Sequence, residues 1–272
     1  MKKTALLLVL LASILTSWAY DFSAVAPTGQ TLYYSITSDT TVGVDRPDNR
    51  YDWVGFPQPT DTLIIPSTVV HAGTTYTVTA ICRLAFWGCD SLTAVTIPNT
   101  VTAIGSSAFA HCRSLVSVNI PNTIPSIGNS TFLLCSSLAS VVIPSSVTSI
   151  GDYAFHYCGS LANVTIPASV TSIGTSAFSH CSSLTSVAIP NSVTSIGEHA
   201  FRDCVSLTSI TIPTSVTTIG VCAFAHCSSL TSVAIPNSVT AIPEWAFDSC
   251  ISLTSVSIPN SVTSISRSAF RL

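Results

Sequence analysis

The chain has 272 residues and a formal net charge of −3, and only 8% of its residues are charged whereas 47% are hydrophobic. Nothing in it resembles the basic patch or stripe that nucleic-acid-binding proteins carry, and a polybasic membrane-binding segment is equally absent. Apart from the first residues, no uncharged apolar run approaches the roughly 20 residues that a membrane-spanning helix requires. We therefore expect the remainder of the chain to be exposed to water and covered mainly by Ser and Thr.

Residues 1–19 read as a signal peptide. Lys2 and Lys3 precede an apolar stretch from Ala5 to Leu15, and Ser17-Trp18-Ala19 fits a small-x-small cleavage site. We therefore expect export and cleavage after Ala19. The alternative is an uncleaved anchor, which no second hydrophobic segment or basic flank supports. After cleavage, seven arginines and 12 acidic residues leave a formal charge of −5.

Residues 20–62 hold half of the acidic residues and show no repeat. They contain the aromatic "TLYYSI" and the proline-rich "VGFPQPTDT", and we predict a β-rich N-terminal cap, because solenoids need their first coil covered. The motif "LIIPSTV" (63–69) then begins a repeat pattern. Residues 70–78 interrupt that pattern, and Ala72-Gly73 predicts the tip of an inserted hairpin.

From residue 79 onward the chain repeats every 23 residues. Phe recurs from 86 to 270, Cys from 89 to 250, and the proline of an Ile-Pro pair from 98 to 259, each in steps of 23 without a slip. A fixed period of this size is typical of a solenoid, in which each unit buries its apolar face against its neighbours.

One unit, "LTSVAIPNSVTSIGEHAFRDC" (184–204), indicates how a coil is built. Alternating apolar residues before Pro190 predict a short strand that proline ends. Val193 and Ile196 predict a second apolar edge, and Gly197 predicts a turn. The segment "EHAFRDC" predicts one helical turn that directs Phe201 and Cys204 inward. The residues that vary between units are expected to lie outside.

The unit "LTSVxIPxSVTSIGxxAFxxC" resembles the treponemal-type leucine-rich repeat of BspA-like surface proteins over about residues 63–272. The resemblance implies a right-handed leucine-rich-repeat solenoid, mostly β with short helical turns, preceded by the β-rich cap. It also implies a secreted or cell-surface protein that binds host matrix proteins or other cells, and it brings no catalytic residues.

The cysteine column suggests disulfide or metal chemistry, but packing explains it better. Stacked coils about 4.8 Å apart keep Cβ atoms too far apart for an undistorted disulfide, so we expect buried, inert thiols. His111, His180 and His226 lie two or three coils apart, too far to share one zinc ion. Cys222 and His226 are spaced like a nucleophile pair, yet a solenoid ridge offers no cleft or third group.

We therefore predict a protein-binding module, an adhesin that contacts a host matrix protein, a surface protein or a glycan. It would need no cofactor or metal and would bind no nucleic acid. A structural spacer without a specific ligand is the alternative that the sequence leaves open. An enzyme is disfavoured, because no carboxylate pair, triad or metal-ligand set is evident.

The strand positions flanking the inward valines carry neither charge nor aromatic rings, although the strand face is the usual site in related solenoids. The outer turns carry both, and we predict a contact patch of Tyr153, Tyr157 and Arg202 on a helical ridge. The alternative is that these positions only solubilise the surface. We also expect self-association through the uncapped strand edge beside "RSAFRL", or a truncated gene product.

Overall fold

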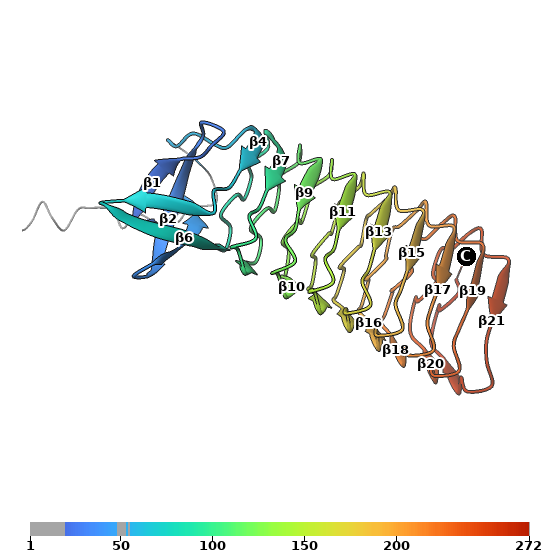
Figure 1. The fold of residues 1–272 in the computed structure, drawn as a ribbon. Helices are drawn as coiled ribbons and strands as arrows, with labels where there is room; N and C mark the ends of the chain where they lie inside the picture. Colours follow the sequence, from blue (N-terminus) through green and yellow to red (C-terminus); the bar gives the residue numbers. More distant parts are fainter. Residues whose placement is uncertain (1–19, 48–52, 54, 272) are drawn as a thin grey trace, which may run out of the picture.

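A computed structural model describes residues 20–47, 53 and 55–271, and the predicted signal peptide lies outside these residues. Figure 1 shows a small rolled sheet at the N-terminal end and a row of stacked coils that extends from it to the C-terminus. The coils form a β-solenoid of about eight turns, as the repeat predicts. Within the described residues there is no helix.

The chain contains 22 strands among the described residues. Their bounds are β1 Phe22–Val25, β2 Thr31–Ser38, β3 Thr41–Asp45, β4 Asp61–Ile64, β5 Thr68–His71, β6 Thr74–Ile81, β7 Leu92–Thr96, β8 Ala103–Ile104, β9 Ser117–Asn119, β10 Ser126–Ile127, β11 Ser140–Val142, β12 Ser149–Ile150, β13 Asn163–Thr165, β14 Ser172–Ile173, β15 Ser186–Ala188, β16 Ser195–Ile196, β17 Ser209–Thr211, β18 Thr218–Ile219, β19 Ser232–Ala234, β20 Ala241–Ile242, β21 Ser255–Ser257 and β22 Ser264–Ile265.

The N-terminal sheet has the strand order β1-β2-β3-β6-β5. Its edge strands β1 and β5 come together, because the Phe22 ring stacks on the His71 ring with centroids 4.2 Å apart. Tyr34, Val42 and Val44 are completely buried inside this roll. A strongly rolled sheet with an aromatic interior can thus cover the end of a solenoid without a helix.

The roll and the solenoid share strand β6. Its first part pairs with β3 and β5, and its last residues Ala80 and Ile81 pair in parallel with Ala103 and Ile104 of β8. Residues 68–81 form a β5–β6 hairpin whose tip is Ala72-Gly73, both with positive φ. The hairpin therefore belongs to the N-terminal sheet while its second strand begins the coils.

Two parallel ladders run along the solenoid. The long-strand ladder comprises β4-β7-β9 followed by β11-β13-β15-β17-β19-β21. The short-strand ladder follows the Ser-Ile, Ala-Ile or Thr-Ile pairs of the even-numbered strands from β8 to β22. From β7 onward each residue pairs with the one 23 positions later, for example Val141 with Val164. This register places equivalent positions of the repeat above one another in successive coils.

Phenylalanine and cysteine columns form the core of the solenoid. Consecutive Phe rings from 86 to 270 are stacked with centroids 5.2–5.6 Å apart and interplanar angles of 1–14°. All ten cysteines are free, and the eight of the column are buried. From Cys112 to Cys250, each thiol donates to the carbonyl of a Phe 26 residues earlier, at 3.1–3.3 Å.

The turn between glycine and cysteine in each coil is not helical, contrary to the sequence-based prediction. In residues 151–158 the amides of Ala154, His156 and Cys158 bond within their own turn, whereas those of Tyr153, Phe155 and Tyr157 donate to carbonyls of the next coil at 2.8–3.0 Å. Alternation of this kind requires left-handed residues, and Tyr153 and Tyr157 have φ of 57° and 60°. The segment is a chain of tight turns, since an α-helix would keep every amide bond internal.

The glycine that recurs in the coils from Gly105 to Gly220 also differs from expectation. Gly197 does not have positive φ and so is not needed for a left-handed turn. A Cβ there would lie 2.6 Å from the backbone carbon and oxygen of Gly174 in the preceding coil. Glycine is required at this position because the two backbones approach so closely.

Candidate interaction surface on the turn ridge

The solenoid presents two contrasting surfaces. The strand face, defined as the outward residues of the odd-numbered strands from β9 to β21, carries Ser, Thr, Ala, Val and Asn. The turn ridge, defined as the residues between the glycine and cysteine positions of each coil, carries the aromatic and charged side chains. Because Tyr, Trp and Arg contribute most to protein-binding energy, the turn ridge is the candidate interaction surface.

A cluster at the middle of the ridge contains all three residues predicted as a contact patch. Tyr153 and Tyr157 are 42% and 43% exposed. The His156 ring lies between them, with centroid distances of 5.5 Å to Tyr153 and 4.4 Å to Tyr157. The two tyrosines therefore meet through an intervening histidine, without the helical i, i+4 contact that the sequence suggested.

Arg202 joins this cluster through two further side chains. The Tyr157 ring stacks on His180 at 4.1 Å, and Nε2 of His180 lies 3.4 Å from Oδ2 of Asp203. Nε of Arg202 lies 3.1 Å from the same oxygen. Sequence reasoning missed His156, His180 and Asp203 as members, because it assumed a helical backbone.

Burial gives the histidines of this cluster lowered pKa values. Burial, and next the neighbouring His180, lower the pKa of His156 to about 4. The pKa of His180 is also lowered, chiefly by burial, although Asp203 opposes the effect. Both rings are consequently neutral near pH 7 and contribute aromatic surface instead of charge.

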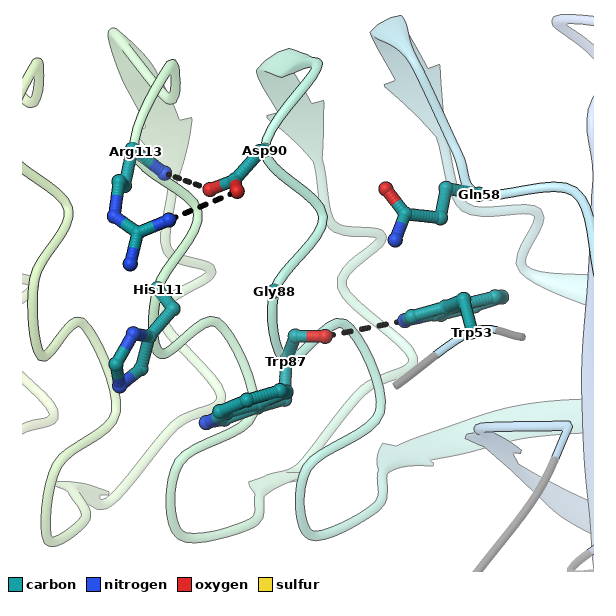
Figure 2. A pocket seen from close by; sticks show the side chains of 7 residues that line it. All are labelled: Trp53, Gln58, Trp87, Gly88, Asp90, His111 and Arg113. Carbon is teal, nitrogen blue, oxygen red and sulfur yellow. Dashed lines mark hydrogen bonds and ion pairs between the residues drawn. The ribbon is translucent and has the colours of Figure 1, made fainter. Parts of the chain in front are cut away.

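A hollow at the junction between the N-terminal sheet and the solenoid forms a second feature of the ridge (Figure 2). It has a volume of about 140 Å³. Trp53 of the N-terminal region donates its indole N–H to the Trp87 carbonyl at 3.1 Å, and Arg113 Nη1 bonds Oδ2 of Asp90 at 2.9 Å. The lining residues are Trp53, Gln58, Trp87, Gly88, Asp90, His111 and Arg113.

A third feature lies near the last coils and has a volume of about 210 Å³. Asp248, which is only 3% exposed, accepts two hydrogen bonds from Arg271 at 2.7 and 3.1 Å. Nε2 of His226 lies 3.9 Å from Oδ2 of the same carboxylate. The hollow is lined by Arg202, Cys222, Ala225, His226, Trp245, Asp248 and Arg271.

The remaining residues considered for chemistry are separated or unactivated. Burial raises the pKa of Cys222, which is opposite to the shift that activates a cysteine nucleophile. His180 and His226 each face a different aspartate, and His111 lies against the Trp87 ring at 4.9 Å. In the described part of the chain, no three His, Cys, Asp or Glu residues are grouped to hold a metal ion.

Comparison with known proteins identifies the repeat. A family model described as "BspA type Leucine rich repeat region" matches in six copies over residues 69–185 and 171–272. No curated protein matches the sequence. Within residues 20–47, 53 and 55–271, no helix is long and apolar enough to cross a bilayer.

Solved structures with the same fold come from several bacteria. A leucine-rich repeat protein of T. pallidum is 32% identical, with a TM-score of 0.63 over 73% of this chain and 87% of that chain. One from Bacteroides ovatus is 26% identical, with a TM-score of 0.58 over 92% and 80% of the two chains. The pneumococcal vaccine antigen PcpA, at 18% identity and a TM-score of 0.63 over 89% and 71%, shares the fold alone.

Proposed function

We propose that this chain, which belongs to the BspA-type leucine-rich repeat family, is an exported adhesin that binds a host matrix or cell-surface protein through the middle of its turn ridge. Leucine-rich repeat proteins commonly bind proteins, and the family indicates no catalytic activity. Export follows from the signal peptide predicted for residues 1–19. No cofactor or enzymatic step forms part of the proposal.

The observation that carries this proposal is the position of the exposed rings. Tyr153 and Tyr157 are more than two-fifths exposed. The His156 ring contacts both tyrosines, and the His180 ring stacks on Tyr157. Rings fixed in this way lose little conformational entropy on binding. Arg202, whose side chain is 41% exposed, adds a cation at the margin of the cluster.

The strand face offers much less to a protein partner. Val142, Thr165 and Ala188 are adjacent, paired positions on it, and all three are exposed. Such side chains provide neither aromatic anchors nor charge, so a partner on this face would depend mainly on shape. A spacer without a specific ligand is the alternative function, and it predicts that neither surface matters for binding.

The experiment compares two triple variants with the unchanged protein on a panel of immobilised extracellular-matrix proteins and glycans. The ridge variant carries Tyr153→Ser, Tyr157→Ser and Arg202→Ser. The strand-face variant carries Val142→Arg, Thr165→Arg and Ala188→Arg, and thermal unfolding verifies that both remain folded. We expect binding to a panel protein to fall at least about tenfold only in the ridge variant.

Loss of binding in the strand-face variant alone would overturn the ridge assignment. If the unchanged protein binds no member of the panel, the result favours a structural spacer without a specific ligand. If it binds only glycans, the proposed protein partner is wrong and the ligand is a saccharide.

A further inference from the structure

One column of ridge side chains is interrupted at the junction hollow. The position two residues after the core phenylalanine holds a side chain in the seven coils that follow, namely His111, Leu134, Tyr157, His180, Asp203, His226 and Ser249. In the first coil this position is Gly88, with φ of 73°, and a Cβ there would meet no atom within 4 Å. Gly88 therefore leaves open the space that a side chain occupies at this position in the following coils.

The walls of this hollow are held in place before any ligand arrives. Trp53 is 7% exposed and is fixed by its hydrogen bond to the Trp87 carbonyl. Opposite it, Asp90 accepts bonds from both the side chain and the backbone amide of Arg113, at 2.9 and 3.4 Å. A preformed site of this kind needs little reorganisation on binding.

Several polar groups around the hollow still have hydrogen-bonding capacity. The Gln58 amide faces the hollow (Figure 2), and neither it nor the His111 ring is hydrogen-bonded to any described residue. Burial and the nearby Arg113 lower the pKa of His111, so its neutral ring has one donor and one acceptor. Arg113 uses a single guanidinium nitrogen for Asp90 and retains further N–H donors.

The charges of the hollow cancel, which restricts the class of ligand. The Asp90 carboxylate disfavours phosphate, sulfate and carboxylate groups, and the Arg113 guanidinium disfavours cations. A purely apolar ligand would leave the Gln58 and His111 groups without partners. A ligand that fits must be neutral, small, and rich in groups that both donate and accept hydrogen bonds.

We propose that the junction hollow binds one neutral sugar unit of a glycan. Each sugar hydroxyl both donates and accepts, which matches the mixed set of Gln58, His111, Asp90 and Arg113. Trp87 lines the same hollow. This site does not depend on the proposed protein contact, since Gly88 and Tyr157 are three coils apart, about 14 Å.

The test measures binding of methyl glycosides of glucose, galactose, mannose and N-acetylglucosamine to the purified protein by saturation-transfer NMR. N-acetylneuraminic acid and glucosamine serve as the anionic and cationic counterparts. Gly88→Leu fills the hollow with a residue that the same column accepts at Leu134, where φ is 59°. Ser249→Leu places the same side chain in this column seven coils away and is the matched control.

We expect saturable, roughly millimolar binding of at least one neutral glycoside, weakened at least about tenfold by Gly88→Leu and unchanged by Ser249→Leu. Gln58→Ala, on an exposed side chain, should weaken binding several-fold and remains informative if Gly88→Leu does not fold. The site is refuted by tighter binding of a charged sugar, by full binding in both Gly88→Leu and Gln58→Ala, or by no binding at millimolar concentrations. None of these results tests the proposed contact at Tyr153, Tyr157 and Arg202, because the variants of those residues are assayed for protein binding.

Discussion

In the phenylalanine column inside the solenoid each side chain meets a copy of itself in the next coil, whereas most side chains of the turn ridge meet a different residue. Phe155 stacks on Phe178 and Phe178 on Phe201, while on the ridge Tyr157 stacks on His180, which faces Asp203. The core phenylalanines and the ridge side chains belong to the same turns of the backbone. Identical core residues thus support varied ridge residues, and the aromatic and charged side chains lie where the packing does not require the same residue in every coil.

The largest effect is expected from interrupting the interior column. Phe178→Ala removes a fully buried ring that contacts both neighbouring coils, and we expect a loss of about 3–5 kcal/mol in unfolding free energy. Hydrogen exchange should show loosening centred on that coil, because coupling is between nearest neighbours. Uniform exchange along the array would contradict this, and the exposed Tyr157→Ala is the control.

The close approach of the coils can be tested with two glycines. Gly197→Ala would force a Cβ against the backbone of Gly174, and we expect a destabilisation of about 2–3 kcal/mol in urea unfolding. At Gly128 the nearest atom would be the Thr131 side-chain oxygen at 3.4 Å, so Gly128→Ala should cost less than about 1 kcal/mol. Equal effects would show that conformational freedom, and not contact, explains both glycines.

Acid should weaken the ridge cluster specifically. Because the pKa of His156 is about 4 in the folded protein and about 6.5 when unfolded, the unfolded state takes up a proton first as the pH falls. Stability is therefore complete above about pH 6.5 and decreases toward pH 4, by about 1 kcal/mol after allowing for solvent screening.

His156→Leu should remove this component of the pH dependence, since Leu133 occupies the equivalent position one coil earlier. Thermal unfolding between pH 4 and 7 provides the measurement. An identical pH profile in the variant would show that other groups are responsible.

The smallest effect concerns the last described coil, where the interior is no longer covered. Ile258 and Ile265 are 42% and 53% exposed, whereas their counterparts Ile235 and Ile242 are 4% and 0% exposed. We expect a purified chain that ends at residue 272 to self-associate weakly at micromolar concentration through the β21 and β22 edges. Light scattering should show a monomer after Ile265→Lys, and a monomeric unchanged protein would contradict the prediction.

Features that follow from the 23-residue period could be predicted from the sequence. Features that depend on hydrogen bonds between coils, or on the non-repeating N-terminal segment, could not. The Phe and Cys columns could be assigned from period and polarity alone. The ridge at Tyr153 and Tyr157 was predicted as helical because local spacing cannot reveal that alternate amides bond to the next coil. The junction hollow was missed because Trp53 comes from a non-repeating segment, although Gly88 in a column of side chains was a readable signal.

The hydrogen bonds between coils run toward both neighbours, which affects how the molecule would respond to force. The amide of Ala162, just before β13, donates to the preceding coil at Ala139, whereas the ridge amide of Tyr153 donates to the following coil at Thr175. Each coil is therefore fastened to both neighbours on opposite sides. Tension along the solenoid axis would load the successive coil-to-coil contacts in series and release one coil at a time. A solenoid of this design would therefore lengthen stepwise under force while its remaining coils stay folded.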